Sequence, residues 1–167
     1  MKYIYRYAVV SLMGIGFSIM ANADVKSMSL SISATLESTC LAGTGASGNI
    51  LFGTLDFGSQ VFLNQRISAS SIISVTCNVD MPYNVLLGSG NSSTTASRYM
   101  VKNATGEQIQ YNLFVDAAYS TIWDNQTGVS GKATGGAQTL NVYGLVPAQS
   151  TPSSGIYTDT VIVTVNW

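Results

Sequence analysis

The sequence predicts an all-β protein, and three observations support that fold class. Apolar residues alternate with polar ones along most hydrophobic stretches, which is the period of a half-buried strand. Clusters rich in Gly, Ser, Asn and Asp separate these stretches, and no window of a dozen residues keeps the spacing of an amphipathic helix. About seven to nine short strands with such turns favour an immunoglobulin-like β-sandwich, with a closed barrel as the alternative.

The first 23 residues have the pattern of a secretory signal peptide. Lys2 and Arg6 precede an apolar run over residues 8–20, and Ala21-Asn22-Ala23 supplies a small-x-small cleavage site. A membrane anchor is the competing interpretation, but a spanning helix needs roughly 20 apolar residues and this run is shorter. We therefore expect cleavage after Ala23, export of the protein, and a mature chain from Asp24 that does not span the membrane.

The clearest strand pattern covers residues 28–36, at the start of the mature chain. Apolar side chains would line one face of this strand, and Ser or Thr hydroxyls would line the other. The apolar set is Met28, Leu30, Ile32, Ala34 and Leu36.

Further strands are expected at short intervals along the rest of the chain. Period-two alternation predicts strands over residues 73–77, 109–115 and 161–167. The last of these would place on one face Val161, Val163, Val165 and Trp167. Shorter candidates cover residues 51–57, 83–87, 98–101 and 139–146.

Turn clusters separate these strands, and they cover residues 43–48, 88–93, 103–106, 124–136 and 150–155. The chain has no internal repeat, and no linker divides the part that follows the signal peptide. We therefore expect residues 24–167 to form a single domain.

Cys40 and Cys77 are the only cysteines of the chain, and we expect them to form a disulfide. An even count in an exported protein indicates a structural bridge. A metal site built on two cysteines would lack further soft ligands, and a redox pair is usually more closely spaced.

Charge is scarce, which excludes several classes of function. Charged residues make up 9% of the chain, against about 25% in typical soluble domains. The seven Lys and Arg residues are scattered and form no basic stripe, so we expect no nucleic-acid partner. Histidine is absent, which removes Ser-His and Cys-His nucleophile pairs and His-rich zinc sites.

The remaining carboxylates do not form a catalytic constellation. A glycosidase would need a carboxylate pair, whereas each carboxylate here occurs singly at a strand end or turn, where Asp usually caps its own backbone. These residues are Asp56, Asp80, Glu107, Asp116, Asp124 and Asp159. We therefore expect a protein that is not an enzyme and holds neither a metal nor a cofactor.

Two interpretations of residues 28–36 remain open from periodicity alone. The segment can be an ordinary first strand, paired within its own sheet. Alternatively, it can be offered to another molecule whose sandwich lacks one strand and therefore exposes an apolar groove and unpaired backbone groups.

Several short stretches, in order, resemble a known family. They are Cys40, Phe52-Gly53-Thr54-Leu55-Asp56-Phe57-Gly58, Ser74-Val75-Thr76-Cys77 with Pro82-Tyr83, Arg98-Tyr99-Met100, Tyr111-Asn112-Leu113-Phe114-Val115-Asp116 before Trp123, Val142-Tyr143-Gly144-Leu145-Val146-Pro147 and Gly155-Ile156-Tyr157-Thr158-Asp159-Thr160-Val161. Together they resemble the spore coat protein U domain, which is shared with the pilins of Csu-type (archaic) chaperone–usher pili. The similarity covers nearly all of the mature chain.

The resemblance implies an incomplete immunoglobulin-like sandwich that lacks its last strand. In such families a periplasmic chaperone lends a strand to the groove, and an outer-membrane usher exchanges it for the N-terminal strand of the next subunit. Here the donor would lie within residues 24–36, and the acceptor groove would be bounded by the strand over residues 160–167.

This resemblance implies a pilus subunit on the cell surface, with a periplasmic chaperone, an outer-membrane usher and neighbouring pilin subunits as partners. Such a subunit would support adhesion and biofilm formation. The alternative is a monomeric exported β-sandwich that binds a ligand such as a carbohydrate.

Overall fold

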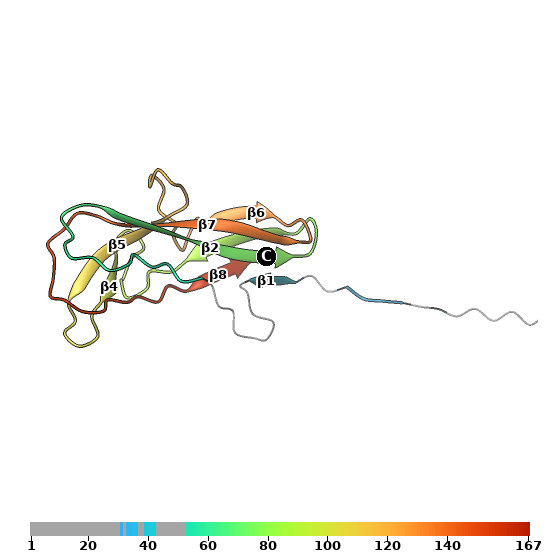
Figure 1. The fold of residues 1–167 in the computed structure, drawn as a ribbon. Coiled ribbons are helices and arrows are strands. Elements are labelled where there is room, and N and C mark those ends of the chain that lie inside the picture. Colours follow the sequence, from blue (N-terminus) through green and yellow to red (C-terminus); the bar gives the residue numbers. More distant parts are fainter. Residues whose placement is uncertain (1–30, 32, 37–38, 43–52) are drawn as a thin grey trace, which may run out of the picture. The chain divides into compact units, whose positions relative to one another are not determined.

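A computed structural model describes residues 31, 33–36, 39–42 and 53–167. The chain divides into two compact units, residues 1–35 and residues 36–167, and the strands all belong to the second. The described residues contain eight strands (Figure 1), namely β1 (Cys40–Ala42), β2 (Ile67–Cys77), β3 (Pro82–Leu87), β4 (Arg98–Val101), β5 (Gln108–Phe114), β6 (Val129–Lys132), β7 (Ala137–Val146) and β8 (Val163–Asn166).

The strands form two sheets. The larger sheet has the order β1-β2-β7-β5-β4, and the smaller has the order β6-β3-β8. Every neighbouring pair is antiparallel. The predicted all-β sandwich is therefore confirmed.

Strand register defines two ends of the second unit. The disulfide end holds β1, the last residues of β2 and the turn over residues 78–81 that leads to β3. The hairpin end holds the turn over residues 102–107 between β4 and β5, the start of β2 and the end of β7. Strand β8 runs towards the disulfide end, because Val163 pairs with Leu87 and Asn166 with Asn84.

The core lies between the sheets and is almost entirely apolar. β2 contributes Ile73 and Val75, β7 contributes Val142 and Val146, and β3 contributes Tyr83, Val85 and Leu87. Alternate residues of β2, β3 and β7 point into this core, which is the burial pattern that period-two sequences produce.

Most predicted strands are present, and the differences follow from pairing. The predicted strand over residues 139–146 extends to Ala137, and that over 73–77 extends back to Ile67, because β2 and β7 pair along ten residues. Strand β6 lies inside a predicted turn cluster. Gly131 of this strand has no side chain, and this leaves room for the Tyr83 ring to pack against it. Residues 53–57 belong to no strand, although a strand was predicted over 51–57.

Residues 31 and 33–36 of the predicted first strand are exposed and belong to no strand. Leu36 is 92% exposed. Met28, Leu30 and Ile32 lie outside the described residues, as does the predicted signal peptide over residues 1–23. An alternating segment becomes a strand only where a partner supplies backbone hydrogen bonds and covers its apolar face.

The expected disulfide is present between Cys40 and Cys77, and it joins β1 to the end of β2. Thr39 extends this anchor, because its main-chain N–H donates to Asn78 Oδ1 at 2.7 Å and its carbonyl accepts from the Asn78 N–H at 3.2 Å. Thr39 and Cys40 are therefore fixed to the end of β2 both covalently and by hydrogen bonds.

We predict that replacing both cysteines with serine lowers the free energy of unfolding by roughly 4 kcal/mol, the loop-closure value for a separation of 37 residues. Mass spectrometry of the non-reduced mature protein should show one Cys40–Cys77 linkage and no alkylatable thiol. Two free thiols in the exported protein would contradict the assignment.

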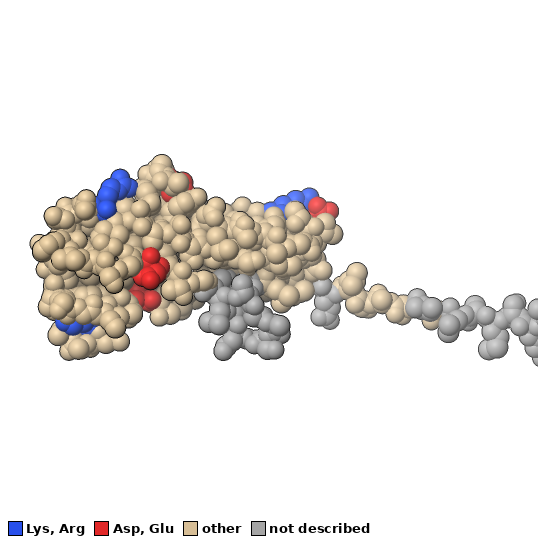
Figure 2. Space-filling model, in the orientation of Figure 1, with Lys and Arg blue, Asp and Glu red and all other residues tan. Residues whose placement is uncertain are grey.

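Helices long and apolar enough to cross a membrane are not found among the residues that the structure describes. The face in Figure 2 is mostly uncharged, with a few isolated acidic and basic side chains. One exposed ion pair at the disulfide end joins Lys132 Nζ to Asp80 Oδ1 at 2.8 Å.

Candidate functional site: an apolar groove beside the C-terminal strand

Two open hollows of about 570 Å³ each lie side by side along one edge of the sandwich. The outer hollow reaches Val61 and Ser153 at the hairpin end, and the inner hollow reaches Ile73 and Val163. They share six lining residues, Leu55, Asp56, Phe57, Met100, Ile156 and Tyr157. They therefore form one continuous groove, and we call it the β8 groove.

One wall of the groove is the segment over residues 53–61. Leu55 and Phe57 are half-buried and point into the core, whereas Thr54, Asp56 and Gly58 are exposed. Phe57 packs edge-on against Tyr111, with 6.0 Å between ring centroids. A side chain at Gly144 of β7 would collide with Leu55 and Phe57, so this glycine allows the wall to approach the sheet.

The opposite wall is the chain from Gly155 into β8. Val161, Val163 and Val165 are half-buried and pack against the core, as their alternation predicted. Trp167, on the same face by alternation, is 61% exposed. The main-chain N–H of Gly88 donates to the Ile162 carbonyl at 2.8 Å and holds this wall beside β3.

Both walls have main-chain groups without strand partners. Strand β8 is an edge strand that pairs with β3 alone among the described strands. Within the described part of the chain, residues 53–62 share no main-chain-to-main-chain hydrogen bond with another segment. The groove therefore combines an apolar floor with two unpaired backbone edges, which is the chemistry that receives an extended strand.

The floor of the inner hollow includes a buried tyrosine. The Tyr111 hydroxyl donates to Asp159 Oδ2 at 2.7 Å, and Asp159 Oδ1 accepts from the main-chain N–H groups of Asn91 and Thr160. Burial, together with the Asp159 hydrogen bond, raises the pKa of Tyr111, so its hydroxyl remains a donor. This network fixes the chain at Asp159, immediately before the alternating residues of the wall.

Arg98 of β4 connects the two sheets beneath the groove and is fully buried. Its guanidinium donates to the carbonyl oxygens of Leu87, Gly88, Thr95 and Trp123 and to Asn112 Oδ1, over 2.7–3.4 Å. Burial lowers the pKa of Arg98, while Tyr111, Asp159 and Asp124 oppose that shift. Since Gly88 in turn holds Ile162, Arg98 anchors the β8 wall.

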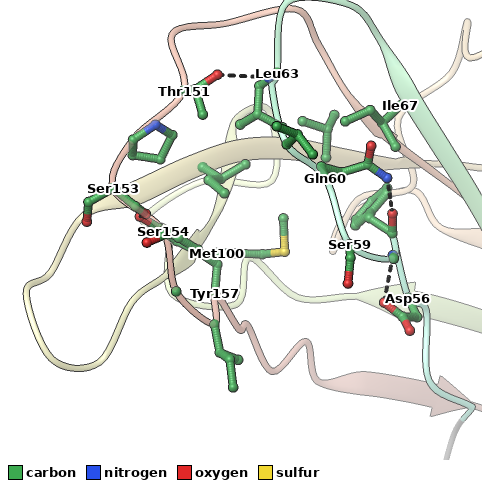
Figure 3. A pocket seen from close by; sticks show the side chains of 18 of the residues that line it. Asp56, Ser59, Gln60, Leu63, Ile67, Met100, Thr151, Ser153, Ser154 and Tyr157 are labelled. Carbon is green, nitrogen blue, oxygen red and sulfur yellow. Dashed lines mark hydrogen bonds between the residues drawn. The ribbon is translucent and has the colours of Figure 1, made fainter.

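A polar cluster holds the rim of the outer hollow. Lys102 Nζ donates to Ser153 Oγ at 2.7 Å and to the Ser154 carbonyl at 2.8 Å. The Glu107 carboxylate accepts from the Ser153 hydroxyl and main chain, and from Thr105, and these bonds lower the pKa of Glu107 to about 2. In Figure 3 the chain at Ser153 and Tyr157 lies across the hollow from Asp56 and Ser59.

Asp116 and Asp124 have the capping role predicted for turn carboxylates. Asp124 Oδ1 accepts from the main-chain N–H groups of Gly128, Gln126 and Thr127, and these bonds lower the pKa of Asp124. Hydrogen bonds from Ser120 and Thr121 lower the pKa of Asp116 in the same way. In the described part of the chain, no group of three or more acidic or cysteine side chains could hold a metal ion.

The structure brings together only part of the predicted site. Val161, Val163 and Val165 line or adjoin the groove, whereas Ala34 and Leu36 are exposed and Met28, Leu30 and Ile32 lie outside the described residues. The 53–61 wall was not anticipated as a groove wall, although its Leu55–Phe57 alternation was visible. Arg98 was noted only as part of the family resemblance, and its anchoring role was missed, because sequence does not reveal whether an isolated arginine is buried.

Comparisons with known proteins identify the family. The model of the Spore Coat Protein U domain matches residues 26–164. Protein U of Myxococcus xanthus is 27% identical over 157 residues, which cover 88% of this chain and 88% of that protein.

Among solved structures, a similar chain occurs in the crystal structure of the CsuC–CsuE chaperone–tip adhesion subunit pre-assembly complex. That complex comes from archaic chaperone–usher Csu pili of Acinetobacter baumannii. The similar chain is 22% identical with a TM-score of 0.49, and the match covers 80% of this chain and 40% of that one. This chain therefore spans less than half the length of the solved chain. Because the family model matches most of its length, the chain belongs to the Spore Coat Protein U domain family.

Proposed function

We propose that this protein is a structural subunit of a surface pilus assembled by the chaperone–usher route through donor-strand exchange. In this proposal residues 24–36 of one copy occupy the β8 groove of the next. The observation that carries the proposal is the groove itself, an open channel with an apolar floor, bounded on both sides by backbone edges without strand partners among the described residues.

The acceptor side is supported by the chemistry of the groove. A strand laid between β8 and residues 53–61 would give both edges hydrogen-bond partners and cover the apolar floor. It would also cover Val161, Val163, Val165 and the exposed Trp167 at the end of the wall. A soluble monomer gains nothing from leaving such an edge open, because it invites aggregation.

The donor side is supported by the alternation of residues 28–36. Met28, Leu30, Ile32, Ala34 and Leu36 would face the groove, and the Ser and Thr side chains would face solvent. Ala34 and Leu36 are exposed in the isolated chain and available to another copy.

A subunit with an open groove needs protection before assembly. In the proposed route a periplasmic chaperone occupies the groove first, and an outer-membrane usher then exchanges it for the donor segment of the next subunit. Fibres on the cell surface would support adhesion and biofilm formation.

Deleting residues 164–167 tests the acceptor side. The truncation removes most of β8, so we expect loss of co-purification with the chaperone and degradation of the subunit in the periplasm. The matched control is Thr164→Ala, which removes an exposed hydroxyl group from the outer face of the same strand. This variant should bind the chaperone normally. Normal complex formation by the truncated chain would overturn the acceptor assignment.

A further inference from the structure

We propose that the outer face of the large sheet binds an acidic polysaccharide whose sugars carry carboxylate groups. This inference goes beyond the pilus function proposed above and concerns a different surface. The site consists of Arg66, Phe114, Tyr119 and Tyr143, and we call it the aromatic face. None of these four residues lines either hollow of the β8 groove, so a strand in the groove would leave the aromatic face open.

Strand register brings two of the rings together on the side of the large sheet that faces away from the core. Phe114 of β5 follows the buried Leu113, and Tyr143 of β7 follows the buried Val142. Because successive side chains of a strand point to opposite faces, both rings lie on the outer face. Phe114 and Tyr143 are direct cross-strand partners, and Ser70 of β2 is the next residue in that row. The row therefore offers two partly exposed rings beside an exposed hydroxyl group.

The third ring comes from the loop that follows β5, where the backbone is strained. Tyr119 has a φ of 58°, in the left-handed region that residues with a side chain rarely adopt. Its ring packs edge-on against Phe114, with 5.6 Å between ring centroids. The Asp116 carboxylate holds the loop by accepting from the main-chain N–H groups of Ser120 and Thr121 at 3.1 and 2.8 Å. Because such strain persists only where the surrounding structure enforces it, the loop holds Tyr119 firmly in place beside Phe114.

Arg66 gives the aromatic face its charge. Its guanidinium carbon lies 5.0 Å from the centre of the Tyr119 ring, and the side chain is exposed. The two ion pairs among the described residues are formed by Lys102 and Lys132, so no described carboxylate pairs with Arg66. An arginine that stacks on a ring keeps its planar fork of N–H donors free at the edge, and this fork matches the two oxygens of a carboxylate.

A carboxylated sugar fits this combination of groups. The C–H side of a pyranose ring packs on aromatic rings, which are apolar over their faces. Its hydroxyl groups need polar partners, and Ser68 and Ser70 are exposed on the outer face of the neighbouring strand β2. The Arg66 fork would receive the carboxylate. The protein has a formal net charge of −1, so general attraction to a polyanion is not expected and recognition must be local.

The open shape of the aromatic face favours a polymeric ligand over a single sugar. A flat site covers only part of a ligand and therefore binds one sugar weakly, whereas tight small-molecule sites are concave. In the proposed fibre each subunit would present one aromatic face. Simultaneous binding of repeating sugars by several subunits would strengthen attachment by about 10²–10⁴-fold without any new contact.

Retention of the exported full-length protein on immobilised polygalacturonate tests this inference. We expect the protein to bind polygalacturonate and to bind its fully methyl-esterified form, which has the same rings but no carboxylate, about tenfold more weakly. Arg66→Gln removes the cationic fork and should lower affinity for polygalacturonate by a similar factor. Tyr119→Asn should do the same, because asparagine tolerates the left-handed conformation but supplies no ring. The matched control is Lys132→Gln, which removes an exposed cation at the disulfide end and should bind normally.

Arg66→Gln and Tyr119→Asn leave the groove and the donor segment unchanged, so both variants should be exported and form fibres of normal length. Equal retention on the two polymers, or equal losses for Lys132→Gln and Arg66→Gln, would overturn the inference. Side-by-side bundling of wild-type fibres that Tyr119→Asn abolishes would also overturn it, because the aromatic face would then bind a second copy. Selective binding of polygalacturonate by a wild-type protein that never forms fibres would support this inference and overturn the proposed function.

Discussion

Replacing Leu30 or Ile32 with aspartate is expected to abolish fibre growth while leaving export and chaperone binding intact. Both side chains belong to the apolar face of the proposed donor, so either carboxylate would be buried without a partner in the groove of the next copy. Burying an unpaired charge costs several kcal/mol. In the proposed route the chaperone occupies the groove of the same subunit and not its donor, so the chaperone complex should form at normal yield.

The size of this effect follows from what the donor contributes. Met28, Leu30, Ile32 and Leu36 would each stabilise the junction by about 1.5–3 kcal/mol on burial. Main-chain hydrogen bonds to the two groove edges would each add roughly 1 kcal/mol. A junction of this kind resists dissociation, and a single inward charge removes much of its apolar contribution.

Ser31→Asp is the matched control, because Ser31 lies on the hydroxyl face between the two test positions. Its carboxylate would remain in solvent, and fibre length by electron microscopy should be unchanged. If Leu30→Asp and Ile32→Asp subunits still form long fibres, residues 28–36 are an ordinary first strand and the donor assignment is wrong.

Replacing Arg98 with methionine is expected to have the largest effect on stability of any single change in the second unit. Methionine retains much of the packing volume but removes the guanidinium donor from four main-chain carbonyl groups, whereas Asn112 Oδ1 keeps the Leu113 main-chain N–H as a donor. Each buried group left unsatisfied costs about 1–3 kcal/mol. We expect a loss on the order of 5 kcal/mol, comparable to the whole stability of a marginal domain.

Urea unfolding of the disulfide-intact protein measures this loss, and Arg66→Met is the control. Arg66 is exposed and lies 5.0 Å from the centre of the Tyr119 ring, an interaction that contributes about 0.5–1 kcal/mol at such sites. Arg98→Lys should also destabilise strongly, since an ammonium group cannot reproduce the guanidinium fork. A loss below about 1 kcal/mol for Arg98→Met would contradict the anchoring role.

The strands that sequence predicted correctly are those whose partners lie within the chain. β2, β3, β5 and β7 show clear alternation, and each packs an apolar face against the core. Residues 33–36 alternate as clearly as these strands but form no strand. Alternation shows that one face of a segment will be buried, but it does not show which molecule covers that face. The same limit applies to residues 53–57, where Leu55 and Phe57 pack inward while the backbone shares no main-chain hydrogen bond with another described segment.

The groove was predictable on one side only. The alternation of Val161, Val163 and Val165 indicated the β8 wall. The opposite wall depends on long-range contacts of Leu55 and Phe57 with Gly144. Arg98 depends on carbonyl groups at the end of β3 and at Trp123, which lie 10 to 25 residues away in the sequence. Such contacts join residues far apart in sequence, so no local pattern contains them.

Moving the donor to the other end of the chain tests whether residues 24–36 fill the β8 groove. In this variant residues 24–36 are deleted from the N-terminus and attached after Trp167 through a turn of about four residues, so that they can fold back along β8 as a hairpin. We expect a monomer that does not polymerise and whose Tm rises by about 10 °C or more, and the same variant with Ile32→Asp should lose that rise. An unchanged Tm, or fibres formed by the rearranged chain, would contradict the claim that this segment fills the β8 groove.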